Sequence, residues 1–262
     1  GSTPDGGWLL SLPNLPAGNH LVWVTTYEAL PVATTTAMNA HIVEAVDAGM
    51  AVSRVHVAWL ELEVSPGQFD WSSLDNEFQR VATPSSAVLL LVETVDSEGF
   101  TMPSDLVDPA NRYRLAQGRA FDDPVILARF DALIDGLAPR LAGRPVFAFS
   151  VGNEPDNYLD AYPPSSQEGQ AWINALRGFL THARAKILSK LPGVAVGVTL
   201  TQGGLEKGFD LSTLLNASDV AMFNYYCQGP DLLVDDLTEL PSDLDQMLAA
   251  AGQRPLLIQE LG

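Results

Sequence analysis

The sequence predicts an α/β protein built as a (β/α)8 barrel of the TIM type. Its 262 residues are close to the ~250 residues that are typical of one such barrel. Short apolar runs alternate with stretches of helical periodicity, and this alternation implies a parallel sheet with right-handed crossovers. No Gly-rich loop follows the first predicted strand, which argues against a doubly wound sheet. We therefore expect a lead-in segment over residues 1–19 and one barrel domain over residues 20–262.

The first half of the barrel is predicted from three strands and two helices. The strands are short runs rich in β-branched and aromatic residues, as expected for strands buried on both faces. They cover residues 20–27, 51–59 and 87–92. The helical stretches cover residues 36–49 and 70–82. Asp70 stands at the start of the second helix, where a carboxylate is a favourable cap.

The second half follows the same alternation. Residues 124–141 form an amphipathic helix whose apolar face carries Ile126, Phe130, Leu133, Ile134 and Leu137. The further helices are predicted at residues 167–191 and 243–251. The further strands are predicted at residues 145–151, 194–200, 220–226 and 256–260.

Two irregularities interrupt this pattern. Residues 94–123 form a loop of about thirty residues without clear periodicity, and a loop of that length is usually functional or disordered. The sequence stops two residues after Glu260, so an eighth strand is absent and the barrel is expected to be truncated after strand seven. An open barrel leaves sheet edges unpaired. Residues 8–12 are the only spare apolar run that offers a substitute.

Composition excludes several classes of partner. The chain has 32 Asp and Glu against 14 Lys and Arg, a net charge of −18, whereas nucleic acids and anionic membranes need a basic surface. No apolar run approaches the ~20 residues of a membrane helix. Cys227 is the only cysteine, so no internal disulfide is possible. Localisation is only weakly constrained; a secreted or periplasmic protein is favoured over a cytoplasmic one.

Two glutamates close predicted strands. Glu154 follows the apolar run that ends at Gly152, and Glu260 ends the last predicted strand. A carboxylate is expensive in a barrel core but not at the carboxyl ends of the strands, where barrel enzymes carry their active sites. Two carboxyl groups presented from two strands of one sheet are the minimal equipment for hydrolysing a glycosidic bond.

At this point the chain resembles the clan-A glycoside hydrolases, whose catalytic carboxylates lie on barrel strands four and seven. The similar segments are VGNEP (151–155), IQELG (258–262), SRV (53–55), Trp59 with EVSPGQFDW (63–71), and FNYY (223–226). The resemblance spans roughly residues 20–262. It implies a retaining hydrolase of β-glycosidic bonds in an oligo- or polysaccharide, with Glu154 as acid/base, Glu260 as nucleophile, and neither a cofactor nor a metal.

Six further residues are candidates for binding or support. Asn153 is placed to hydrogen-bond a sugar hydroxyl, and Arg54 to hold Glu260 ionised by a charge-assisted bond. Strand alternation lets only one of Tyr225 and Tyr226 face inward, and the resemblance favours Tyr226. Trp59 is equally suited to stacking on a sugar or to packing in the core. The sixth candidate is Asn224 in the strand-six segment.

Other polar residues near the predicted mouth carry less weight. Glu61, Glu63 and Glu93 are expected to be solvated loop carboxylates. The four histidines show no metal-ligand spacing, and His56 is the only one near the predicted site.

Two alternatives remain open. A non-hydrolytic carbohydrate-binding barrel would keep the cleft without turnover. A metal-dependent isomerase or aldolase would need inward His and Asp clusters or a lysine at the mouth, whereas the three lysines lie elsewhere. The sugar, the linkage, endo or exo action and the oligomeric state are not determined by the sequence.

Overall fold

The computed structural model describes residues 52–81, 87–227 and 238–261 of the chain. Several predicted features lie outside these residues, namely the lead-in segment 1–19, the apolar run 8–12, the strand 20–27 and the helix 36–49. Apart from residue 51, predicted strands two to seven fall within the described part.

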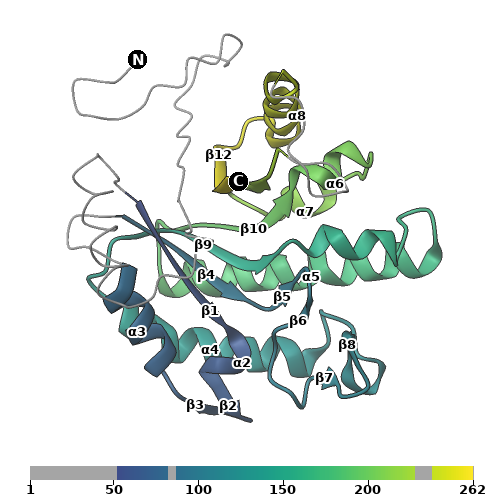
Figure 1. Cartoon of the computed structure of the whole chain (residues 1–262). Coiled ribbons are helices and arrows are strands. Elements are labelled where there is room, and N and C mark those ends of the chain that lie inside the picture. The colour runs from purple at the N-terminus through teal and green to yellow at the C-terminus, as the bar shows by residue number, and fades with distance from the viewer. Residues whose placement is uncertain (1–51, 82–86, 228–237, 262) are drawn as a thin grey trace, which may run out of the picture.

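A curved six-stranded sheet forms the centre of the described structure (Figure 1). Its five neighbouring pairs are all parallel. In sheet order the strands are β1 (Val52–Ala58), β4 (Ala87–Glu93), β9 (Val146–Asn153), β10 (Ala195–Thr201), β11 (Ala221–Tyr225) and β12 (Leu256–Leu261). Each strand lies within two residues of its predicted limits. Sequential parallel strands in this order are the arrangement of a (β/α)8 barrel, of which the described strands form a part.

Helices surround this sheet on the outside (Figure 1). The larger ones are α3 (Ser72–Val81), α4 (Pro124–Leu141), α5 (Gln167–Lys190) and α8 (Leu240–Ala251). Shorter helices are α2 (Trp59–Leu62), α6 (Gln202–Glu206), α7 (Ser212–Leu215) and the 3-10 turns η1 (Ala116–Gly118) and η2 (Pro155–Asp160). Among the described helices, none has the length and the apolar character needed to cross a membrane.

The starts of the helices follow from local chemistry. Asp123 accepts a hydrogen bond from the Val125 backbone N at 2.8 Å, so α4 begins where the sequence predicted. Helix α3 begins at Ser72, two residues later than predicted. Asp70 lies before it, and its carboxylate accepts from the Ser72 backbone N at 2.9 Å.

The long loop after β4 is folded rather than irregular. It contains the hairpins β5 (Val95–Asp96) with β6 (Gly99–Phe100), and β7 (Val107–Asp108) with β8 (Asn111–Leu115). An additional hairpin, β2 (Glu63–Ser65) with β3 (Gln68–Phe69), follows β1. Five of these six strands have only two or three residues, too few to show a period, and β8 (Asn111–Leu115) has four polar or exposed residues in a row, so the sequence did not predict them.

The sheet is buried on both faces. The face toward the helices joins the large core, whereas a smaller apolar cluster fills the inner face and contains Val52, Leu89, Ala148, Val220, Met222 and Leu257. Side chains alternate between these faces along each strand. Apart from Leu91, most positions that continue the inner face toward the carboxyl ends of the strands are polar, and several of them form the candidate site.

Candidate active site

Both predicted catalytic glutamates lie just beyond irregularities in strand pairing. The step of three residues from Ser150 to Asn153 in β9 stands opposite the step of two residues from Gly197 to Thr199 in β10. In β12 the pairing with β11 skips Gln259. One extra residue in a strand forms a β-bulge, which turns the following side chain in a new direction and is frequent beside active sites. The bulges therefore help to aim Glu154 and Glu260.

Glu154 has an unusual backbone conformation for a residue with a side chain. Its φ is 50° and its ψ is 42°, in the left-handed region, and its N–H donates to the Thr199 carbonyl at 2.8 Å. Holding a residue other than glycine in this region costs about 1–3 kcal/mol, so the surrounding structure must enforce it. Pro155, the first residue of η2, fixes the chain immediately after the glutamate.

Two amide side chains hold the Glu154 carboxyl group. Asn224 Nδ2 donates to Oε1 at 2.7 Å, and Asn157 Nδ2 donates to Oε2 at 3.0 Å. Asn224, a predicted supporting residue, comes from the inner face of β11. Asn157 was not predicted, although the three-residue spacing in a 3-10 turn after Pro155 places it beside Glu154.

Burial raises the pKa of Glu154 from an ordinary value of 4.5 to about 7. The hydrogen bond from Asn224 opposes this rise, because it favours the charged form. Negative charges on Asp156, Glu260 and Asp96 add to the rise. A carboxyl group with this pKa retains its proton near neutral pH, as a general acid must.

The carboxylate of Glu260 is held by two donors that differ from those of Glu154. Arg54 Nη1 forms a hydrogen-bonded ion pair with Oε1, and the Tyr226 hydroxyl donates to Oε2. Burial, followed by the hydrogen bond to Glu260, raises the pKa of Tyr226 above its ordinary value, so the phenol stays neutral and remains a donor. One cationic and one phenolic donor are partners suited to an ionised carboxylate.

Asn153 connects Asn224 on β11 to Asp96 in the loop after β4. Its Nδ2 donates to Asp96 Oδ1 at 2.9 Å, and its Oδ1 accepts from Asn224 Nδ2 at 3.2 Å. Asn153 is buried, and Nδ2 still has one hydrogen available for a ligand. Asp96 was not predicted, because it lies in a two-residue strand of the loop expected to be irregular.

Asp156 ties the turn that carries Glu154 to the next strand. Its fully buried carboxylate accepts from the Thr201 backbone N at 3.0 Å and from Thr201 Oγ1 at 2.5 Å. Burial raises the pKa of Asp156 to about 6. A Cβ atom on Gly204 would lie 2.3 Å from the Asp156 carboxylate, so only glycine leaves room for this contact. We infer that this contact helps to keep Glu154 in its left-handed conformation.

Two predicted site residues lie elsewhere. Trp59 is fully buried, donates from Nε1 to Glu63 at 2.9 Å and packs edge-on against Phe130. It is a core residue and has no face available for a sugar. Tyr225 is also buried, and its hydroxyl donates to Asp243 of α8 at 2.9 Å. Strand alternation turns Tyr225 toward the helices and Tyr226 toward the site, so the inclusion of Tyr225 was wrong.

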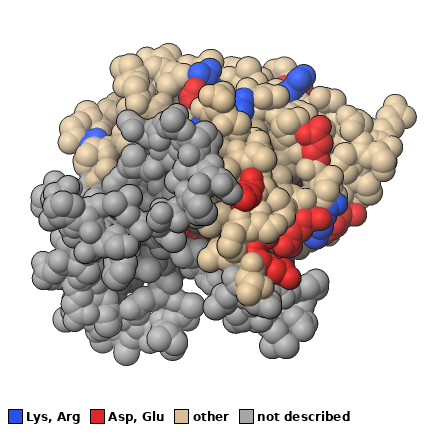
Figure 2. Space-filling model, turned by 90° about the horizontal axis from the view of Figure 1, so that it is seen from above, with Lys and Arg blue, Asp and Glu red and all other residues tan. Residues whose placement is uncertain are grey.

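The expectation of solvated carboxylates after β1 and β4 was correct only for the exposed Glu61. Glu63 is buried and binds Arg129 Nε at 2.6 Å, and Glu93 is buried 3.0 Å from His56 Nε2. Within the described residues, no group of three His, Cys, Asp or Glu side chains is arranged to hold a metal ion. On the face drawn in Figure 2, the described Lys and Arg side chains are scattered among acidic ones.

Comparisons with known proteins agree with this architecture. No protein-family description and no curated protein matches the sequence. Solved structures do match. A β-galactosidase from Rahnella sp. R3 is 14% identical, with a TM-score of 0.61 over 92% of this chain and 45% of that chain. The exo-β-1,4-mannosidase Op5Man5 from Opitutaceae bacterium strain TAV5 is 14% identical, with a TM-score of 0.58 over 93% of this chain and 51% of that one.

A β-glucuronidase from Bacteroides uniformis is 12% identical, with a TM-score of 0.55 over 88% of this chain and 23% of that one. The chain thus spans about a quarter to a half of the length of these three structures. At such identities the likeness establishes the fold. The described residues form part of the (β/α)8 barrel found in these glycoside hydrolases, and the predicted fold class is confirmed.

Proposed function

We propose that the protein is a retaining glycoside hydrolase that cleaves β-glycosidic bonds in an oligo- or polysaccharide, with Glu154 as acid/base and Glu260 as nucleophile. The observation that carries the proposal is the contrast between the two carboxyl groups. Burial raises the pKa of Glu154, whereas Glu260 forms an ion pair with Arg54 and accepts a hydrogen bond from the Tyr226 hydroxyl. Pairs of carboxyl groups whose environments differ in this way divide the roles of acid and nucleophile.

The first step forms a glycosyl-enzyme. A Glu260 carboxylate oxygen attacks the anomeric carbon, and the bond from that carbon to the leaving oxygen breaks. Glu154 gives its proton to the leaving oxygen, which departs as an alcohol. Arg54 and Tyr226 hold the attacking carboxylate in one orientation.

The second step releases the sugar. Glu154, now ionised, takes a proton from water while the water oxygen attacks the anomeric carbon, and the bond to Glu260 breaks. Two inversions restore the β configuration. Asn224 and Asn157 suit both steps, because an amide group can donate to the carboxylate or accept from the protonated acid after rotation.

The structural neighbours narrow the choice of substrates to test. They are named β-galactosidase, β-1,4-mannosidase and β-glucuronidase. The first screen therefore uses aryl β-galactosides, β-mannosides and β-glucuronides, followed by β-linked disaccharides of the sugar that is turned over.

Two variants separate the proposed roles. Glu154→Gln removes the transferable proton, so turnover of disaccharides is lost while aryl glycosides with good leaving groups still form the glycosyl-enzyme. Glu260→Ala removes the nucleophile, so all substrates are affected and added azide restores part of the turnover. Steady-state kinetics across a series of leaving groups measure both effects.

Glu61→Gln is the matched control, since Glu61 is an exposed glutamate just after β1 and has no part in the proposed chemistry. It should leave turnover unchanged. Equal losses in Glu154→Gln on good and poor leaving groups would contradict the acid role. Sugar binding by the unaltered protein without any turnover would favour the non-hydrolytic barrel.

A further inference from the structure

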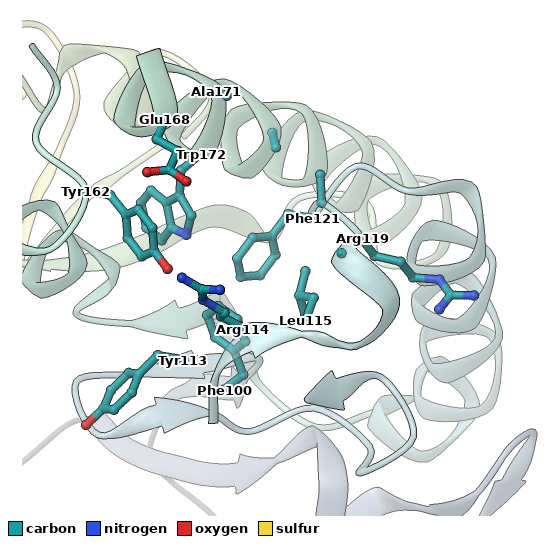
Figure 3. A pocket seen from close by; sticks show the side chains of 13 residues that line it. Phe100, Tyr113, Arg114, Leu115, Arg119, Phe121, Tyr162, Glu168, Ala171 and Trp172 are labelled. Atoms are coloured by element: carbon teal, nitrogen blue, oxygen red, sulfur yellow. The ribbon is translucent and has the colours of Figure 1, made fainter. Parts of the chain in front are cut away.

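A cavity lies outside the candidate active site (Figure 3). It has a volume of about 330 Å³ and lies between the loop after β4 and the first turns of α5. Its walls include Phe100, Phe121, Tyr162 and Trp172, while Arg114 and Glu168 are exposed at its rim. Neither proposed catalytic glutamate lines it. The volume is at the lower end of the ~300–1,000 Å³ of small-molecule sites.

Parallel aromatic rings give the cavity a rigid wall. Tyr162 and Trp172 are tilted by only 3° with centroids 6.3 Å apart, and Trp172 and Tyr158 by 12° at 5.7 Å. Tyr158 continues the stack to Phe100, with a tilt of 8° and a separation of 5.5 Å. The C–H face of a sugar packs on aromatic surface of this kind, as apolar faces do generally.

The wall also contains an unused hydrogen-bond donor. Trp172 Nε1 is buried and has no hydrogen-bond partner among the described residues. In Figure 3 the indole nitrogen is on the side of the ring that faces the cavity. A buried N–H without a partner is unfavourable by about 1–3 kcal/mol, so an acceptor in the cavity would relieve it. A wholly apolar ligand has no acceptor and would leave the Trp172 N–H unpaired.

The rim supplies the complementary polar groups. Among the described residues, neither the Arg114 guanidinium nor the Glu168 carboxylate forms an ion pair, whereas Arg119 lies 3.6 Å from Asp123. One cation and one anion at the rim suit a neutral ligand with both donors and acceptors. We propose that this cavity is a second binding site for a neutral sugar residue, which packs on Trp172 and Tyr162 and hydrogen-bonds Trp172 Nε1 and Glu168.

The cavity belongs to the same end of the barrel as the glutamates. The two segments that line it come directly after β4 and β9 in the sequence. They therefore lie at the carboxyl ends of the strands, where barrel active sites are found. Tyr158, within the aromatic stack, donates to the Asp96 carbonyl at 2.8 Å, and the Asp96 carboxylate accepts from Asn153. These hydrogen bonds connect the wall of the cavity to the candidate active site through Tyr158, Asp96 and Asn153. A sugar held here would anchor a longer glycan beside the mouth of the barrel; this role, but not the binding itself, rests on the proposed function.

The indole N–H signal of Trp172 in a ¹⁵N–¹H NMR spectrum reports binding directly. The chain has five tryptophans, and Trp172→Phe identifies the signal by its loss. Methyl β-galactoside and methyl β-mannoside are the neutral probes, with methyl β-glucuronide as the charged comparison. At least one neutral probe should move the Trp172 signal saturably, with a Kd on the order of millimolar. Trp71, which packs against Phe69 and Arg140 away from the cavity, is the internal control and should not respond.

Two sets of variants test the location. Ala171→Phe places a ring in the cavity from an exposed position of α5, and it should abolish the response of Trp172. Glu168→Ala should raise the Kd about three- to tenfold by removing one hydrogen bond, whereas Glu168→Gln should change it less than about threefold. Unaltered positions of the other indole signals show that each variant is folded.

A Trp172 signal that stays fixed up to about 100 mM of every probe overturns the proposal, as does an equal response in Ala171→Phe. The response should persist in a variant with Glu154→Gln and Glu260→Gln together. Because that titration requires no turnover, failure of the hydrolase proposal would leave the predicted binding intact, and the two proposals fail separately.

Discussion

The pKa of Glu154 predicts a pH dependence of folding stability that one substitution removes. In the unfolded chain the carboxyl group titrates near its ordinary value of 4.5, whereas in the folded protein it titrates near 7. Between pH 4.5 and about pH 7, the Glu154 carboxyl group is ionised in the unfolded chain but still protonated in the folded protein. The stability contributed by the protonated group is therefore complete below pH 4.5 and is lost as the pH rises through 7. Glu154→Gln has no proton to release, so it lacks this loss.

The size of the effect follows from the two pKa values. A rise from 4.5 to about 7 corresponds to about 3 kcal/mol at about 1.4 kcal/mol per pH unit. The side chain is half-buried, and water screens part of the interaction. We therefore expect Glu154→Gln to gain about 1–3 kcal/mol over the unaltered protein between about pH 4.5 and about pH 8.

Urea unfolding of both proteins at several pH values measures this difference. Taking the difference largely removes the contributions of groups that titrate alike in both proteins, although Asp156 lies close enough to couple. The reasoning is refuted if the free energies of unfolding of the two proteins run parallel across the whole pH range. It is likewise refuted if the gap closes as the pH rises, because that sign would mean a lowered pKa of Glu154 in the folded state.

Further predictions concern Asn224, Tyr226 and Trp59. Asn224→Ala removes a hydrogen bond that favours ionised Glu154, so the basic limb of the pH profile of kcat/KM should move to higher pH; a shift to lower pH would contradict this assignment. Tyr226→Phe removes a donor to Glu260 and should lower kcat/KM about 10²-fold, with thermal unfolding nearly unchanged; full activity would exclude the supporting role. Trp59→Phe should lower the free energy of unfolding by about 1–3 kcal/mol without changing KM, whereas a raised KM with unchanged stability would restore Trp59 to the substrate site.

The sequence predicted the central strands and the larger helices of the described part well, because buried positions recur in the sequence with the period of a helix or as continuous apolar runs. Strands such as β4 are continuous apolar runs, and α4 has both an amphipathic stripe and a capping residue at Asp123. The hairpins after β4 were missed because β5, β6 and β7 have two residues each. Helix α8 begins three residues earlier than predicted, since Pro241 is compatible with a first helical turn.

The site was predictable only in part. Glu154, Glu260 and Arg54 were expected at strand ends or on an inner face, and the structure brings the last two into contact. Trp59 was misassigned because sequence does not distinguish a buried indole from an exposed one. Asp156 escaped notice because an acidic residue in a turn is ordinary, and only the folded structure shows its carboxylate buried against Thr201.

The central claim is that Glu260 forms a covalent glycosyl-enzyme. Incubation with 2-deoxy-2-fluoro β-glycosyl fluorides of the galacto, manno and glucurono series, followed by peptide mass spectrometry, tests it most directly. The account predicts one fluorosugar on the peptide that contains Glu260, in the unaltered protein and not in Glu260→Gln. An adduct on another residue would contradict the account, and so would turnover that releases the α anomer without any adduct.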